Sequence, residues 1–144
     1  MKPLVIISCV FVFFCCTRNT EKIKKPDFLV GNWIRINEKK ESKTYETCKK
    51  DLTGIGYTLQ DKDTTFKEIL KIISLNDTLF LSVRGNNKNI TLFKITSQTD
   101  TSFIAENAKN EFPKKILYYK ENNFLKAEVS IPDFKVDFIF ESIK

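Results

Sequence analysis

The chain lacks histidine altogether and is poor in tryptophan, glycine and proline, with 1 Trp, 4 Gly and 4 Pro among 144 residues. Without His it has neither the commonest general base nor the commonest metal ligand. The axial His that holds haem in some small barrels is missing too, and the carboxylates form no cluster with metal-ligand spacing. We therefore expect no cofactor and no metal, and we expect that the protein is not an enzyme.

Arginine is also scarce, because only Arg18, Arg35 and Arg84 accompany the lysines that give the chain its net charge of +6. Proteins that read nucleic acid usually favour Arg for its bidentate hydrogen bonding. The lysines are dispersed as pairs along the chain instead of gathering in one block. We expect a weakly basic, solvated surface and no nucleic-acid partner.

The only long apolar run spans residues 4–14 and ends at Cys15-Cys16, after which residues 17–27 are polar. A membrane-spanning helix needs about 20 apolar residues, so this run fits the apolar part of a signal peptide better. An apolar run that stops at Cys resembles the lipobox of bacterial lipoproteins, in which the Cys thiol is acylated and the Cys becomes the new N-terminus after cleavage. The pattern predicts a lipoprotein signal peptide over 1–15, lipidation at Cys16 (with Cys15 as the alternative) and a flexible tether over 16–27. A signal peptide without lipidation remains the other interpretation.

This processing would leave Cys48 as the one unmodified thiol of the mature chain. A single thiol makes no intramolecular disulfide, so the domain depends on its packed core. With no His to activate it, Cys48 is expected to be a packed or half-exposed thiol. The protein is then expected in the bacterial cell envelope, anchored through its N-terminal lipid on the periplasmic face or in the outer membrane.

Residues 28–144 alternate short apolar stretches with Asn, Asp and Lys clusters at a spacing typical of an antiparallel meander. Polar and apolar side chains alternate within the stretches, for example over 125–131 and 135–141. We expect about ten strands, over 32–37, 43–49, 53–60, 65–74, 78–84, 90–96, 101–106, 115–120, 123–131 and 135–143. Only 67–75 could instead form a helix, because Ile69, Ile72 and Ile73 also fit a helical stripe.

So long a meander has to avoid open edges, and closing it into a barrel leaves room inside for a small ligand. The sequence therefore predicts an all-β domain over 28–144, a single antiparallel meander closed into a lipocalin-like barrel, in preference to a two-sheet sandwich. We expect a monomer.

Several motifs carry a family resemblance. They are Phe28-Leu29-Val30-Gly31-Asn32-Trp33, then Tyr45-Glu46-Thr47-Cys48, then Gly54-Ile55-Gly56-Tyr57, then Phe103-Ile104-Ala105-Glu106-Asn107, and finally Asn110-Glu111-Phe112-Pro113 continuing to Tyr118. Their order and spacing over residues 28–143 resemble an uncharacterised family of bacterial lipocalin-like (calycin-type) lipoproteins. Asn110 and Thr47-Cys48 stand where that family often has His and His-Trp. The resemblance implies a barrel and an envelope location, and it brings no established activity.

The candidate ligand-binding residues are Trp33, Arg35, Glu46, Tyr57, Glu106 and Asn107. If Trp33 points inward, Arg35 does too, and Glu46 on the next strand could pair with it. The pair would be either a polar anchor for a ligand or a salt bridge that fixes strand register.

Glu111, Phe112 and Pro113 are interpreted as a rigid structural corner, because Pro113 removes an amide donor and Phe112 is held extended. Glu106 and Asn107 are expected to bond the backbone of that loop. The alternative is that the motif marks the rim of a binding site.

Three functions fit these patterns. The favoured one is an envelope lipoprotein whose barrel binds a small apolar or amphipathic molecule. The second is a protein-interaction module with no small-molecule ligand, which would show an exposed aromatic patch. The third is an enzyme that uses Glu46, Glu106 and Glu111 in acid–base roles.

Overall fold

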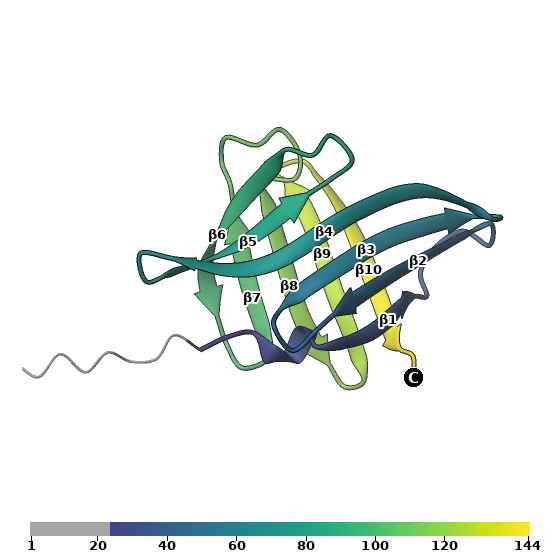
Figure 1. Cartoon of the computed structure of the whole chain (residues 1–144), viewed down its shortest axis with the longest axis horizontal. Helices are drawn as coiled ribbons and strands as arrows, with labels where there is room; N and C mark the ends of the chain where they lie inside the picture. The colour runs from purple at the N-terminus through teal and green to yellow at the C-terminus, as the bar shows by residue number, and fades with distance from the viewer. Residues whose placement is uncertain (1–23) are drawn as a thin grey trace, which may run out of the picture.

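A computed structural model describes residues 24–144 as one all-β domain (Figure 1). A short 3-10 helix precedes ten strands: η1 (Asp27–Leu29), β1 (Gly31–Arg35), β2 (Ser42–Cys48), β3 (Thr53–Gln60), β4 (Asp63–Leu75), β5 (Thr78–Arg84), β6 (Ile90–Gln98), β7 (Ser102–Glu106), β8 (Lys115–Glu121), β9 (Phe124–Ile131) and β10 (Phe134–Ser142). The predicted signal peptide, both candidate lipidation sites (Cys15 and Cys16) and the tether up to residue 23 lie outside the described residues. None of the helices between 24 and 144 is long and apolar enough to cross a membrane.

Each strand pairs antiparallel with the next, and β1 also pairs with β10, which closes the barrel. The fold class is confirmed, and each of the ten predicted strands is present with ends that shift by at most two residues. The helical alternative for 67–75 is wrong. Those residues belong to β4, the longest strand, which pairs with β3 on one side and β5 on the other.

Alternation along the strands separates an interior face from an exposed one. The most completely buried side chains include Phe93, Phe103, Ala105 and Leu125, each the inward member of an alternating pattern. Eight of the ten strands contribute buried apolar side chains to this core, whereas the buried positions of β2 and β3 hold Glu46, Gly54 and Gly56.

One end of the barrel is closed by η1 and the start of β1, at the bottom of Figure 1. Trp33 is almost completely buried there, and its indole Nε1 donates a hydrogen bond to the Leu29 carbonyl at 3.0 Å. Its ring folds back over Gly31, where an added Cβ would lie 3.1 Å from the indole and where φ is +155°. The Gly-x-Trp pattern therefore has a local cause, since only glycine leaves space for the indole and adopts this backbone conformation readily.

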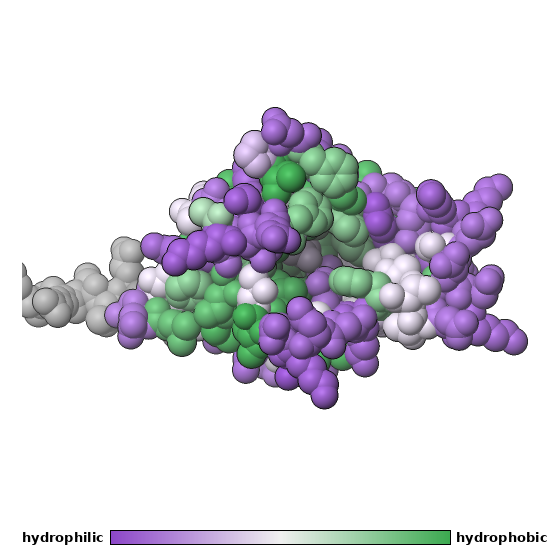
Figure 2. Space-filling view, turned by 90° about the horizontal axis from the view of Figure 1, so that it is seen from above, coloured by the Kyte–Doolittle hydropathy of each residue, from purple (hydrophilic) through white to green (hydrophobic). Residues whose placement is uncertain are grey.

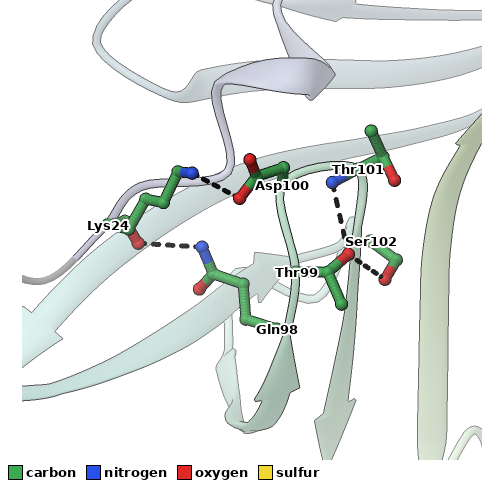
Figure 3. Close-up of polar contacts among 6 residues, drawn as sticks. All are labelled: Lys24, Gln98, Thr99, Asp100, Thr101 and Ser102. Carbon is green, nitrogen blue, oxygen red and sulfur yellow. Dashed lines mark hydrogen bonds and ion pairs between the residues drawn. The ribbon is translucent and has the colours of Figure 1, made fainter.

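The last residues of the predicted tether, 24–27, lie against the same end of the barrel (Figure 3). Gln98 Nε2 donates a hydrogen bond to the Lys24 carbonyl at 2.8 Å, and the Lys24 ammonium contacts the Asp100 carboxylate. Pro26 is fully buried. The described chain thus enters at the closed end, while the loops after β5 and β7 surround the opposite end, at the top of Figure 1.

Candidate functional site

A cavity of about 610 Å³ occupies the barrel interior towards the end opposite η1. Every strand except β7 contributes to its lining. The view onto that end shows a central hollow in which hydrophobic residues lie beside hydrophilic ones (Figure 2). Its walls are apolar and comprise Leu70, Leu81, Val83, Phe93, Ile116, Ala127, Val129, Phe138 and Phe140. Its mouth is bordered by Gly85, Asn87, Asn89, Asn110, Phe112 and Pro113.

The deeper part of this cavity is polar. Glu46 on β2 is only 8% exposed, and its Oε2 accepts a hydrogen bond from the Tyr118 hydroxyl of β8 at 2.9 Å. This bond crosses the barrel between strands that are far apart in the sheet. Glu46 pairs in register with Trp33, which lies at the closed end. A carboxyl is therefore held where the walls would otherwise be apolar.

A second carboxyl, Glu68, lies beside it. Gly56 on β3 pairs with Glu46 on one side and with Glu68 of β4 on the other, so the three residues form one row across the sheet. The Glu68 side chain extends over Gly56, because a Cβ added to that glycine would lie 3.2 Å from Glu68 Oε1. Glycine at this position therefore gives the carboxyl its space. We call Glu46, Glu68 and Tyr118 the polar floor of the cavity.

Enclosure changes the acidity of both carboxyls. Burial raises the pKa of Glu46 to about 7; the hydrogen bond from Tyr118 opposes this rise and the charge of Glu68 adds to it. Burial likewise raises the pKa of Glu68 to about 7. Within residues 24–144 neither carboxylate forms an ion pair. Desolvation without a compensating cation is the physical reason that both acids hold their protons more tightly.

Cys48 lies on the same strand and face as Glu46 but offers no reactive thiolate. Burial and, to a lesser extent, the charges of Glu46, Asp51 and Asp27 together raise its pKa to about 11. A thiol with such a pKa stays protonated at neutral pH and is a poor nucleophile.

The predicted pairing of Arg35 with Glu46 is wrong. The Arg35 guanidinium donates to the Asp137 carbonyl at 2.8 Å and to Asn37 Oδ1 at 2.9 Å, and it lies 4.1 Å from the Phe138 ring centroid. Glu46 pairs with Trp33, two residues before Arg35, which puts the carboxyl deeper in the barrel than the guanidinium. Arg35 therefore borders the cavity near its mouth, away from the polar floor.

Two other predicted ligand contacts have different positions relative to the cavity. Trp33 is packed at the closed end with the Lys120 ammonium 5.9 Å from its ring, and it does not line the cavity. Tyr57 borders the cavity, and its ring stacks on Tyr45 at a centroid distance of 5.1 Å. Of the six candidates, Arg35, Glu46 and Tyr57 border the cavity.

The remaining two candidates, Glu106 and Asn107, lie outside the cavity lining. Glu106 Oε2 accepts a hydrogen bond from the Thr96 hydroxyl at 2.6 Å, so its expected bond to the loop backbone is not formed. Asn107 does bond backbone groups, because its Nδ2 donates to Leu92 O at 2.9 Å and its Oδ1 accepts from Lys109 N at 3.0 Å.

The side-chain hydrogen bond that holds the corner over 111–113 comes from Asn110, the residue before it. Asn110 Nδ2 donates to the Pro113 carbonyl at 2.7 Å, whereas Glu111 is exposed. Phe112 and Pro113 also line the cavity mouth, and the Phe112 ring lies 5.7 Å from that of Phe134. The segment is thus both a hydrogen-bonded corner and part of the rim.

Searches against protein-family models, curated proteins and solved structures found no match. The resemblance to bacterial lipocalin-like lipoproteins therefore stays a prediction from the sequence. Between residues 24 and 144 no group of three or more potential ligands could hold a metal ion. Glu46, Glu106 and Glu111 are not brought together, since only Glu46 lines the internal cavity.

Sequence reasoning missed two residues of the polar floor, Glu68 and Tyr118. A signal for Glu68 was present, because it precedes Leu70 and Ile72 by two and four residues and therefore shares the inward face of β4 with them. The helical alternative for this stretch hid that alternation. Tyr118 gave no such signal, because its hydroxyl partner is 72 residues away in the chain.

We predict that replacing Glu68 with Gln flattens part of the pH dependence of stability. In the unfolded chain both carboxyls titrate near pH 4.5, whereas in the folded barrel they titrate near 7. Between these values the unfolded state releases protons that the folded state keeps, so the free energy of unfolding falls as pH rises. Each carboxyl accounts for about 3 kcal/mol of that fall, because one pKa unit corresponds to about 1.4 kcal/mol.

Urea unfolding of the wild type and of Glu68→Gln at pH 4, 5.5, 7 and 8 measures the effect. The difference in stability between variant and wild type should increase in favour of the variant as pH rises through this window. The matched control is Glu141→Gln, which changes an exposed carboxyl on β10. Equal pH profiles for wild type and Glu68→Gln would show that Glu68 is not desolvated.

Proposed function

We propose that the barrel binds a small apolar or amphipathic molecule in its internal cavity, and that the protein does so as a lipid-anchored lipoprotein of the bacterial envelope. The observation that carries the first part is the cavity itself, about 610 Å³ in volume with mainly apolar walls. Ligand sites typically measure about 300–1,000 Å³ and combine apolar walls with a few placed polar groups.

The composition of the lining strengthens this interpretation. Phenylalanines such as Phe93 and Phe140 line part of the cavity, but smaller side chains, Val83, Thr91, Ala127 and Val129, line another part and leave space inside the barrel. An apolar ligand that fills the space would gain about 25 cal/mol for each Å² of apolar surface removed from water.

A protein-interaction module remains the second candidate, favoured by one observation at the mouth. Phe112 and Phe134 are 44% and 56% exposed, and their rings lie 5.7 Å apart between centroids. The small-molecule function is preferred because the apolar surface of the cavity is concave and spans nine strands, whereas this exposed group is small.

The anchoring part of the proposal rests on the sequence alone. An apolar run that ends at Cys15-Cys16 close to the N-terminus fits a lipoprotein signal peptide. The described chain enters at the closed end of the barrel, so a membrane tether at that end would leave the mouth free for a ligand.

We predict that filling the cavity abolishes binding of an apolar probe. Thr91 lines the cavity, and Thr96 lies on the same strand but is exposed. Titration of the wild type with the neutral fluorophore N-phenyl-1-naphthylamine should give saturable binding at one site. Thr91→Trp should weaken the affinity by about tenfold or more, since the indole occupies the space of the probe.

The control variant, Thr96→Trp, introduces the same side chain outside the cavity and should bind like the wild type. Circular dichroism establishes that both variants are folded. Binding that survives Thr91→Trp unchanged, or a wild type that does not bind, would contradict a ligand site in the barrel.

We also predict that the mature chain is acylated at Cys16, the residue that follows the signal peptide. Metabolic labelling with an alkyne analogue of palmitate should mark the wild type and Cys15→Ser, and it should not mark Cys16→Ser. Labelling lost only in Cys15→Ser would move the site by one residue. No labelling of the wild type would leave an unmodified signal peptide and would refute the anchoring proposal.

A further inference from the structure

Acidic side chains outnumber basic ones in the cavity lining, and they lie deeper in the barrel. Glu46 and Glu68 lie on its polar floor, and Arg35 is the one cationic residue among the lining residues. The guanidinium of Arg35 is already engaged by Asn37, the Asp137 carbonyl and the Phe138 ring near the mouth. When both carboxyls are ionised, the floor therefore carries negative charge that no cation of the lining contacts.

The hydrogen-bonding capacity of the floor is likewise unfilled. Glu46 uses Oε2 to accept from Tyr118, and no hydrogen bond within residues 24–144 reaches its Oε1 or either oxygen of Glu68. No fully buried side-chain oxygen of these residues lacks a partner, so the free oxygens of both acids reach the accessible surface of the cavity. The Tyr118 oxygen can also accept a hydrogen bond, because its proton is directed to Glu46. Three acceptor groups from β2, β4 and β8 thus face one enclosed space.

We infer that the cavity takes an amphipathic molecule with a primary ammonium head, bound between Glu46 and Glu68 on the polar floor with its apolar body directed towards the mouth. This inference rests on the proposed function and specifies its ligand class. A primary ammonium carries three donors and one positive charge, which matches three acceptor groups and the uncompensated carboxylates. A ligand with a carboxylate head would meet like charge in a desolvated site and is disfavoured.

Gly56 sets the position of one of the two acids of this head site. A side chain there would meet the Glu68 carboxyl, whereas glycine lets that carboxyl lie over β3, in the same row of the sheet as Glu46. The apolar body would then contact walls that include Leu81, Val83 and Val129. Head and body thus have separate complementary regions within one cavity.

Binding of a cation is expected to depend on pH. Burial raises the pKa of both carboxyls to about 7, so at pH 5.5 both hold protons and at pH 8.5 both are ionised. The other titratable groups beside them are Tyr118 and Cys48, and Arg35 lies farther off near the mouth. The two acids on β2 and β4 are the ones that change charge in this interval. An alkylamine stays charged throughout, because its pKa is near that of Lys, about 10.4.

The test compares three decyl compounds that share one apolar body, namely decylamine, decanol and decanoate. Their affinities for the full-length protein are measured by isothermal titration calorimetry at pH 5.5 and 8.5. At pH 8.5 decylamine should bind about tenfold or more tighter than decanol, as expected for charge-assisted hydrogen bonds, and decanoate should bind weakest. At pH 5.5 the advantage of decylamine should largely disappear.

Glu46→Gln and Glu68→Gln should each reduce the affinity for decylamine at pH 8.5 about tenfold or more and leave decanol binding nearly unchanged. The matched control, Glu141→Gln, removes an exposed carboxyl and should bind like the wild type. Equal affinities for decylamine and decanol would overturn the ammonium inference and leave the proposed function intact. If none of the three compounds binds, the inference and the proposed function both fail.

Discussion

The pairing of β1 with β10 is the constraint on which the rest of the structure depends. It extends over Trp33–Ser142, Ile34–Glu141 and Arg35–Phe140, and it joins the first strand of the meander to the last. Closure satisfies the backbone groups of both edges, which would otherwise be free to pair with another chain. It also surrounds the interior on all sides, so a side chain that points inward leaves bulk water. Without this short ladder Glu46 and Glu68 would be ordinary surface carboxyls.

Two carboxyls inside a barrel oppose folding, because removing their charge from water costs free energy that one tyrosine hydroxyl only partly offsets. A core built for stability alone would place apolar residues at these positions. The barrel instead keeps an open volume, a glycine that leaves room for Glu68, and acceptor atoms without donors. All of these features lie in the cavity, and each one lowers the free energy of unfolding. A complementary ligand bound there would offset that loss.

Much of the fold could be predicted because alternation is local. The spacing of Leu79, Leu81 and Val83 indicates the inward face of β5 even when its partner strands are unknown, and turn residues mark each hairpin. The site was harder to predict because it depends on register across the barrel. Glu46 was correctly singled out as an inward charged residue, but its partner is Tyr118 on β8 and not Arg35 on the neighbouring strand. Arg35 was the predicted partner because its strand is adjacent to that of Glu46. Tyr118 is the actual partner because the closed barrel brings β8 opposite β2.

The central claim is that the interior, and not the outer surface, receives a ligand. It is tested most directly by intermolecular NOEs between decylamine and the methyl groups of the isotope-labelled protein at pH 8.5. The account predicts NOEs from the decyl chain to Val83 and Val129, which line the cavity. NOEs confined to exposed methyl groups such as those of Ile55 and Leu75, on the outside of the barrel, would contradict it.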